Sequence, residues 1–227
     1  SDDDVCKVVK RLKSDWNIGE DGILSVIDLL EAKNIKVVEI TADMSFDGLS
    51  GYVNNDENMP FVVVNKSFDV ERLRFTGLHE LGHLVMNLSE QMEKKEKERL
   101  CNRFASEMLL SRDVFIEVLG EKRNDISLRE LKALQAVYGI SVDALMFKAK
   151  DLGVISESKY VSFCIRKNKS SAFKNAVEES SYKGTEESSR FDRLVYRALA
   201  SDMISCSKAA VLLNEPIEDV KSKLELV

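Results

Sequence analysis

Apolar residues recur every third or fourth position over most of the chain, and short β-branched runs interrupt this pattern in the first third. The helical spacing is clear over residues 5–16 and 23–32, which predicts two opening helices. Residues 35–40 and 61–64 are rich in valine and isoleucine, and residues 51–53 follow a segment that contains glycine, so three strands are expected. The chain therefore opens with helices and a small sheet.

The next predicted element is a helix over residues 69–87, with Ser67 or Asp69 as its N-cap. Its polar positions make one stripe, and from residue 73 onward every residue off that stripe is apolar or glycine except Arg74. We therefore expect a mostly buried helix with one polar stripe that faces a site. The stripe consists of Arg72, Thr76, His79, Glu80, His83 and Asn87.

Helical patterns account for most of the remaining chain. A charged segment leads into a helix that ends near Leu110, further helices cover residues 113–152, and amphipathic helices resume over residues 191–226. Residues 166–190 are rich in Ser, Lys and Glu and poor in apolar side chains, which predicts a mobile connection. We expect an α+β fold in which a small sheet packs on a pair of helices. The predicted domains are residues 1–155 and, as a helical C-terminal extension, residues 156–227.

The composition is that of a globular protein without a basic character. With 227 residues and 44% hydrophobic content, the chain can bury a core, as one domain or one domain plus a small appendage. The net charge of -6 argues against a protein that mainly wraps nucleic acid, because phosphate binding needs an excess of Lys and Arg. There is no run of roughly 18 apolar residues and no signal-like start, so neither membrane insertion nor export is expected.

The cysteines also bear on the setting of the protein. They lie far apart and form no C-x-x-C pair, which argues against a disulfide framework and a cysteine zinc site and fits a reducing cytoplasm. The chain starts at Ser1 without a methionine, which suggests that it comes from a longer protein. The four cysteines are Cys6, Cys101, Cys164 and Cys206.

The strongest chemical signal lies in the polar stripe. His79 and His83 are the only two histidines of the chain, and Glu80 directly follows the first, in the pattern HExxH. Positions four apart lie on one helix face, so both imidazoles can reach one metal ion with Glu80 beside them. This predicts a zinc site. The alternative is a pair of hydrogen-bonded histidines on a helix.

A catalytic zinc takes three protein ligands, so a carboxylate or a lone cysteine must supply the third. On the following helix Glu98 and Asn102 share one face, and a turn near residues 88 and 89 would let the two helices pack antiparallel. Glu107 points about 180° away and, four residues after Arg103, is expected in a solvent-exposed pair. Glu98 is therefore the predicted third ligand. The alternative is a solvated charge in a charged run.

At these residues the chain resembles a known family. Residues 72–83, RLRFTGLHELGH, and residues 98–110, ERLCNRFASEMLL, look like the ImmA/IrrE metallo-endopeptidase family, which pairs HExxH with a helix of the form E-x-x-A-N-x-F-A. The glutamate of that pattern falls on Glu98. The resemblance covers roughly residues 20–155. The family's alanine is Cys101 here and its terminating proline is Ser111, and neither position is a predicted ligand.

The resemblance implies a zincin-like helical core that binds Zn²⁺ and hydrolyses peptide bonds. Zinc lowers the pKa of water to about 7 and polarises the scissile carbonyl, while Glu80 is expected to carry the proton to the leaving amine. Asn102, one turn beyond Glu98, is expected to hydrogen-bond a ligand histidine, by analogy with the acidic residue of related zinc peptidases. Tyr52 and Arg72 are candidates for stabilising the oxyanion.

Two segments have a structural and a functional interpretation. The strand at residues 61–64 could hold an extended substrate by strand addition, as the resemblance implies, or it could be a plain core strand. The spacing over residues 204–224 is similar to a helix-turn-helix, but Glu218 and Asp219 outweigh the lysines of its second helix. A packed helical hairpin is preferred, and no nucleic-acid binding by this chain is expected.

The expected function, implied by the resemblance, is a cytoplasmic zinc-dependent endopeptidase that cuts a regulatory protein, such as a DNA-binding repressor encoded alongside it. Glu80 is the catalytic residue, and His79, His83 and Glu98 are the metal ligands of that prediction. The alternative is a non-catalytic zinc-containing sensor or protein-binding module in transcriptional regulation, which needs the same ligands. Members of the family often carry an N-terminal helix-turn-helix domain, which would precede this chain.

Overall fold

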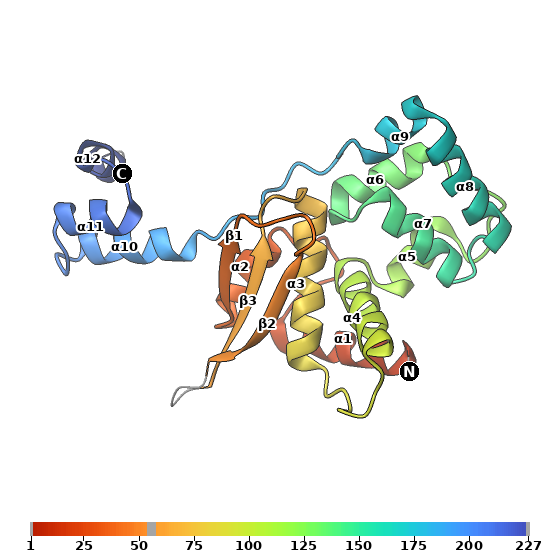
Figure 1. Ribbon diagram of the computed structural model, residues 1–227, viewed down its shortest axis with the longest axis horizontal. Helices are drawn as coiled ribbons and strands as arrows, with labels where there is room; N and C mark the ends of the chain where they lie inside the picture. The colour runs from red at the N-terminus through yellow and green to blue at the C-terminus, as the bar shows by residue number, and fades with distance from the viewer. Residues whose placement is uncertain (1, 54–57, 226–227) are drawn as a thin grey trace. The chain divides into compact units, whose positions relative to one another are not determined.

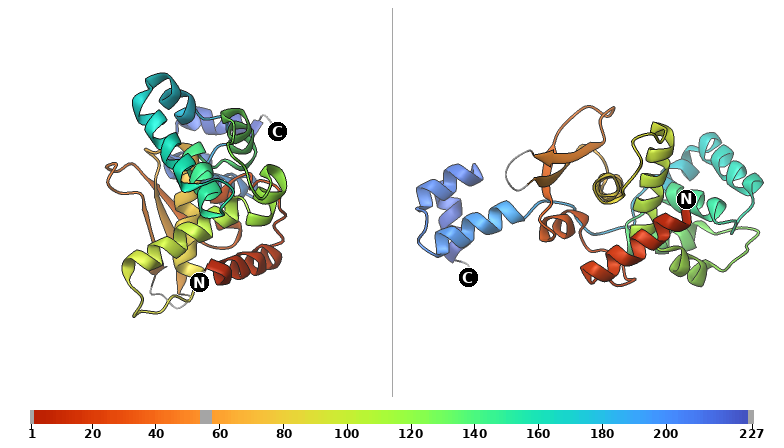
Figure 2. Two further views of the ribbon diagram at one scale, coloured as in Figure 1. Left: turned by 90° about the vertical axis from the view of Figure 1, so that its right-hand side faces the viewer. Right: turned by 90° about the horizontal axis from the view of Figure 1, so that it is seen from below.

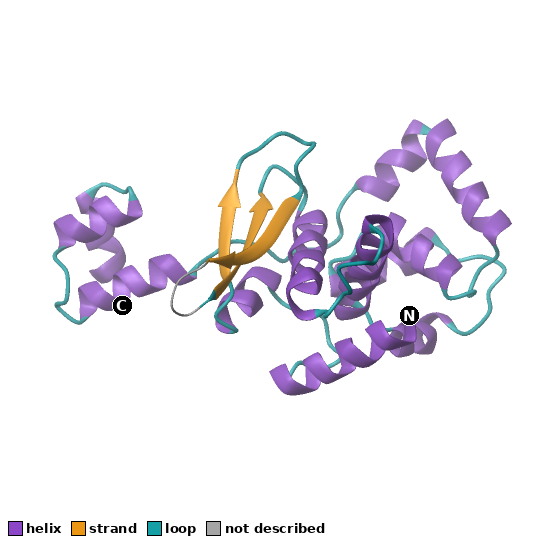
Figure 3. Ribbon diagram, turned by 60° about the horizontal axis from the view of Figure 1, so that its bottom comes forward, coloured by secondary structure: helices purple, strands orange, loops and turns teal. Residues whose placement is uncertain are grey.

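The computed structural model describes residues 2–53 and 58–225, and the chain divides into two compact units, Ser1–Glu186 and Glu187–Val227. Figures 1 and 3 show the elements of both units. In chain order the first unit contains α1 (Asp2–Trp16), α2 (Val26–Ala32), β1 (Lys36–Ile40), β2 (Gly48–Val53), β3 (Met59–Asn65), α3 (Val70–Val85), α4 (Lys94–Leu109), α5 (Arg112–Leu119), α6 (Leu128–Tyr138), α7 (Val142–Asp151), α8 (Glu157–Lys169) and α9 (Ser171–Glu178). The second contains α10 (Arg190–Ala200), α11 (Cys206–Leu213) and α12 (Ile217–Glu225). The predicted α+β class is confirmed.

The sheet has the strand order β1-β3-β2, with β1 parallel and β2 antiparallel to β3. Val62 and Val64 alternate along β3 and are fully buried, because they share the face of the sheet that packs on the helices. β3 is thus the central strand, hydrogen-bonded on both sides. Of the two interpretations left open for this strand, strand addition of a substrate is wrong and the core strand is right, because β1 and β2 occupy both of its edges within the described residues.

Helix α3 lies between the sheet and α4, as Figures 1 and 2 show. This position explains why most residues of α3 off its polar stripe are buried, including Leu78 and Leu81 at 0% exposure. A Cβ on Gly82 would meet the ring of Phe104 at 3.2 Å, so the glycine lets α4 approach α3 closely. Helix α3 therefore forms the centre of the first unit, and its side chains touch every neighbouring layer.

The segment after α7 differs from the prediction. Residues 166–190 were expected to form a mobile connection, but they contain the end of α8 and the whole of α9, and Val177 is buried in the main core. By contacts, the first unit thus extends beyond the predicted domain end at residue 155, to Glu186. The composition was misleading because the polar side chains of this segment have buried partners.

Residues 180–186, here called the strap, run along α3, α2 and α6. The hydroxyl of Ser180 donates to Glu71 of α3, and the hydroxyl of Tyr182 donates to the carbonyl oxygen of Leu24 at 2.8 Å. The guanidinium of Arg74, also on α3, lies 4.5 Å from the centre of the Tyr182 ring. The strap is therefore attached to the helix that carries the HExxH motif.

Glu186 ends the strap with a fully buried ion pair. Its carboxylate accepts from Arg74 Nη1 at 2.5 Å, and both side chains are 0% exposed. The same carboxylate accepts from the backbone N–H groups of Val26 and Ile27 at 2.9 Å and from the Ser25 hydroxyl, at the N-terminus of α2. One buried anion thus compensates the charge of Arg74 and accepts from backbone N–H groups that have no partner within α2.

The second unit has a small core of its own. The predicted helices over residues 191–226 are confirmed as α10, α11 and α12 within the described part of the chain. Their buried side chains are Val195, Leu199, Ala209 and Val220. No helix of the described residues is both long and apolar enough to cross a membrane.

Replacement of Glu186 by alanine should destabilise the first unit by about 3–5 kcal/mol, because Arg74 would be left as a buried charge without a partner. Glu187→Ala, which alters the exposed neighbouring carboxylate, is the matched control and should change the free energy of unfolding by no more than about 0.5 kcal/mol. Urea denaturation followed by circular dichroism measures both. Equal stability of the two variants would contradict the assignment of Glu186 to the core.

Candidate metal centre

The two helices α3 and α4 run antiparallel and bring two pairs of polar side chains face to face. His79 and His83 lie four residues apart on α3, and Glu98 and Asn102 lie four residues apart on α4. The first histidine contacts Asn102, and both contact Glu98, which is the order that an antiparallel pair requires. The turn expected between the two helices is thus present, and Glu98 faces the histidines as predicted.

His79, His83 and Glu98 form a group that could hold a metal ion. Nε2 of His79 lies 3.1 Å from Oε2 of Glu98 and 3.1 Å from Nε2 of His83. The distance from Nε2 of His83 to Oε2 of Glu98 is 3.8 Å. Ligand atoms at about 2.0–2.1 Å from a tetrahedral zinc ion are roughly 3.3 Å apart. The three atoms therefore have the spacing of one face of such a site, which leaves the fourth position free.

Asn102 sets the orientation of the first histidine. Its Oδ1 lies 2.9 Å from Nδ1 of His79, as predicted for a residue that hydrogen-bonds a ligand. This contact takes up Nδ1 and leaves Nε2 of His79 to face Glu98 and His83. Two ring nitrogens and one carboxylate oxygen thus converge on one point, as the ligands of a metal ion do. The arrangement therefore favours a metal centre over two hydrogen-bonded helix histidines.

Glu80 points to the sheet side of the same cleft. Its carboxylate is 8% exposed, and Oε2 accepts from the hydroxyl of Ser50 on β2 at 2.7 Å. The contact depends on Gly48, because a Cβ there would meet the Thr76 side chain and the Val63 carbonyl oxygen at 2.7 Å each. Glu80 is thus held by β2 and does not belong to the group formed by His79, His83 and Glu98.

A cavity of about 670 Å³ opens onto these side chains. Arg72 lies in its wall, and its guanidinium is held by Asp47 at 2.7 Å and lies over the ring of Phe68. Tyr52 is placed differently, since its hydroxyl donates to the carbonyl oxygen of Leu84 and does not line the cavity. Of the two candidates for stabilising an oxyanion, only Arg72 borders the cleft. The lining residues are Ser45, Phe46, Asp47, Gly48, Arg72, Phe75, Thr76, His79, Glu80, Lys94, Glu98 and Asn102.

Two other residues of α4 decide between alternatives left open by the sequence. Cys101 is 0% exposed, and burial, followed by the nearby charges of Glu98 and Glu80, raises the pKa of its thiol to about 12. It remains a protonated, buried side chain, so the carboxylate is the better third ligand. Glu107 was expected in a solvent-exposed pair with Arg103, and this is wrong.

Glu107 is 2% exposed and accepts from Nζ of Lys148 on α7 at 3.1 Å. Its other oxygen accepts from the backbone N–H of Arg112. The prediction that Glu107 lies on the face of α4 opposite Glu98 is correct, because Glu107 points away from the histidines. The helices α5 and α7 cover that face, which a periodicity on α4 alone does not reveal.

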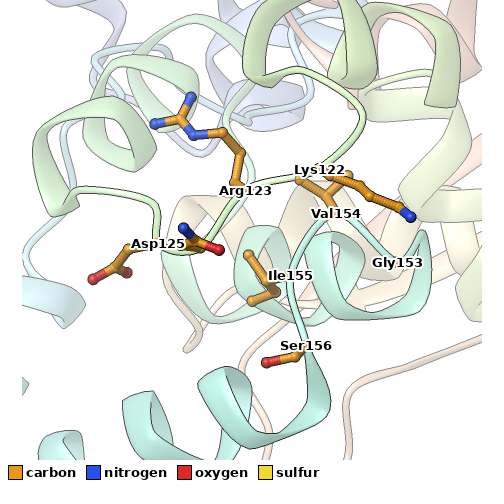
Figure 4. Close-up of a pocket in the computed structure, with 8 residues that line it drawn as sticks. Lys122, Arg123, Asp125, Gly153, Val154, Ile155 and Ser156 are labelled. Carbon is orange, nitrogen blue, oxygen red and sulfur yellow. The ribbon is translucent and has the colours of Figure 1, made fainter.

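Another hollow, of about 610 Å³, lies between the loop before α6 and the loop after α7. Figure 4 shows Lys122, Arg123 and Asp125 of the first loop beside residues 153–156 of the second. The backbone N–H of Arg123 donates to the carbonyl oxygen of Val154, which joins the two loops. None of the candidate site residues lies here, so this hollow is not part of the metal centre.

Ser50 and Gly48 lie at the site next to Glu80, but the HExxH motif does not predict either of them. They lie about 30 residues before Glu80 and reach it only because β2 packs on α3. The one available signal is the resemblance of the segment DGLSG, residues 47–51, to the ImmA/IrrE family.

Two histidines and a glutamate on antiparallel helices, with a further glutamate facing a small sheet, define an HExxH metallopeptidase-like protein. The family model of the IrrE N-terminal-like domain, Peptidase_M78, matches residues 30–150, more than half of the chain, and the chain belongs to this metallopeptidase family. The expected resemblance is thereby confirmed. A comparison with curated proteins found no match.

Asn102→Ala should lower the affinity for zinc by about 10- to 100-fold, because it removes the hydrogen bond that orients His79. Asn124→Ala, at an exposed asparagine outside the cleft, is the matched control and should leave the affinity unchanged. Competition with a chelating dye measures the dissociation constants. Glu98→Ala should lose the metal, and full zinc occupancy in that variant would refute the third ligand.

Proposed function

We propose that this protein is a zinc-dependent endopeptidase that hydrolyses a peptide bond in a regulatory protein, such as a DNA-binding repressor. The observation that carries the proposal is the spacing of His79, His83 and Glu98, together with the separate position of Glu80. Membership of the M78 metallopeptidase family supports the same reaction.

His79, His83 and Glu98 would hold the metal. A zinc ion held there would polarise the scissile carbonyl. It would also lower the pKa of water, so that the water could attack at neutral pH. Glu80 takes the proton of the attacking water and returns it to the amine nitrogen as the C–N bond breaks. Ser50 holds one oxygen of Glu80 and leaves the other for the proton. Hydrolysis therefore needs no covalent intermediate with the protein.

The main chain of the substrate is proposed to extend along β2. Within the described residues this strand pairs only with β3, so its other edge offers unpaired backbone donors and acceptors. The strand lies beside the cleft, since Ser50 contacts Glu80 and Tyr52 contacts the carbonyl oxygen of Leu84. A peptide in extended conformation along this edge would pass in front of the metal centre.

The proposed setting is the cytoplasm. All four cysteines are free, which is the usual state of thiols in a reducing compartment. A repressor encoded beside the gene is the proposed partner, because a regulatory protease and its target are often inherited together. The non-catalytic zinc sensor requires the same ligands, and the role of Glu80 distinguishes it from the enzyme.

Glu80→Gln should lower cleavage of the partner by at least about a hundredfold, because the amide cannot accept the proton, while zinc remains bound. The zinc-loaded chain is incubated with the DNA-binding regulator encoded next to its gene, and new N-termini are detected by mass spectrometry. Glu90→Gln, at an exposed glutamate outside the cleft, is the matched control and should cut at the wild-type rate.

Cleavage by Glu80→Gln at the wild-type rate would remove Glu80 from the mechanism. If neither protein cuts while both bind zinc and the regulator, the non-catalytic module is the correct interpretation.

A further inference from the structure

A second cavity, of about 480 Å³, lies directly beside the metal cleft, between α4, α7 and α8. It shares the residues Phe75 and Asn102 with the wall of the cleft, so the two spaces are adjacent at these side chains. Asn102 is the residue that contacts His79, and Phe75 lies one helical turn before that histidine. The cavity therefore begins within one side chain of the metal centre.

Aromatic rings form the walls of this cavity. Phe75, Phe147 and Tyr160 line it together with Ala144. The rings of Phe147 and Tyr160 make an edge-to-face contact, with their centroids 6.1 Å apart. The ammonium group of Lys150 lies 4.3 Å from the centre of the Phe147 ring. Phe147 is nevertheless 50% exposed, although it belongs to a folded unit with a large core. An apolar ring left open at this point is a surface that a ligand can cover.

The charged side chains of the wall all have partners within the protein. Asp143 pairs with Lys167, and Arg103 with Asp151. Lys148 pairs with Glu107, and Arg99 pairs with Asp2 and Glu96. A charged ligand group would have to compete with these pairs, whereas an apolar group only covers aromatic surface. The cavity therefore favours an apolar occupant.

We propose that this cavity, the aromatic pocket, receives a large apolar side chain of the substrate next to the bond that is cut. The proposal rests on the proposed peptidase function and names a substrate class: proteins with an aromatic or long aliphatic residue beside the scissile bond. Phe147 and Tyr160 determine that specificity, because their rings are the apolar surface that such a side chain would cover. None of the proposed metal ligands lines the pocket, and neither does Glu80. Asn102, which contacts His79, is shared with the cleft.

The test uses binding to the zinc-loaded full chain, so that it does not depend on turnover. Two hydroxamates are compared by isothermal titration calorimetry: acetohydroxamate, which carries only a methyl group, and a hydroxamate that carries a benzyl group. Both have the same metal-binding group. The wild-type protein should bind the benzyl compound at least about tenfold more tightly, as expected for an apolar pocket.

Phe147→Ala should reduce this preference about tenfold and leave the affinity for acetohydroxamate unchanged. Phe191→Ala is the matched control, because Phe191 is 51% exposed and lies in the second unit, and it should keep the full preference. Ala144→Phe, which fills the pocket without removing an aromatic wall, should also abolish the preference. Thermal unfolding of each variant verifies that it is folded.

Equal affinity of the wild-type protein for the two hydroxamates would overturn the pocket and leave the metal centre intact. An unchanged preference in both Phe147→Ala and Ala144→Phe would also overturn it. Failure of the wild-type protein to bind either hydroxamate would instead count against the metal centre and hence against both proposals.

Discussion

The packing of α3 against α4 sets the distances between the two histidines and Glu98 in the metal centre. The spacing of His79 from His83, and of Glu98 from Asn102, follows from helix geometry alone. The distances between the two pairs depend on how closely the helices approach, and that approach is allowed by Gly82 opposite Phe104. Burial of the apolar side chains between them supplies the free energy that holds a carboxylate against two imidazoles. A change of even one methylene group there would alter the separation of the ligands.

Each of the two helices also carries a buried charge whose partner comes from a later segment of the chain. Arg74 on α3 pairs with Glu186 of the strap, and Glu107 on α4 pairs with Lys148 of α7. Burial lowers the pKa of Lys148, and the adjacent carboxylate of Glu107 opposes that effect. Because an unpaired buried charge is strongly unfavourable, each pair permits essentially one position of its helix. The C-terminal part of the first unit therefore helps to define the geometry of a site that it does not touch.

The cleft divides the chemistry between layers. The helices provide the metal-facing atoms, while β2 provides the hydroxyl of Ser50 that orients Glu80. The proposed aromatic pocket lies on the far side of Asn102, where α7 and α8 add Phe147 and Tyr160 to side chains of α3 and α4.

The sequence by itself determined the HExxH helix and placed Glu98 and Asn102 on one face of the next helix, because helical periodicity and the spacing of HExxH are local properties. The contact of Asn102 with a histidine was expected only by analogy with related zinc peptidases. The sequence also determined the α+β class and the family. Only the tertiary structure decided the central place of β3, the contact of Ser50 with Glu80 and the burial of Glu107 and Glu186. The physical reason is that a polar side chain is buried when a distant partner of opposite charge is buried with it. The local composition shows that Glu186 is charged, but it does not show that Glu186 pairs with Arg74, which lies more than a hundred residues earlier in the chain.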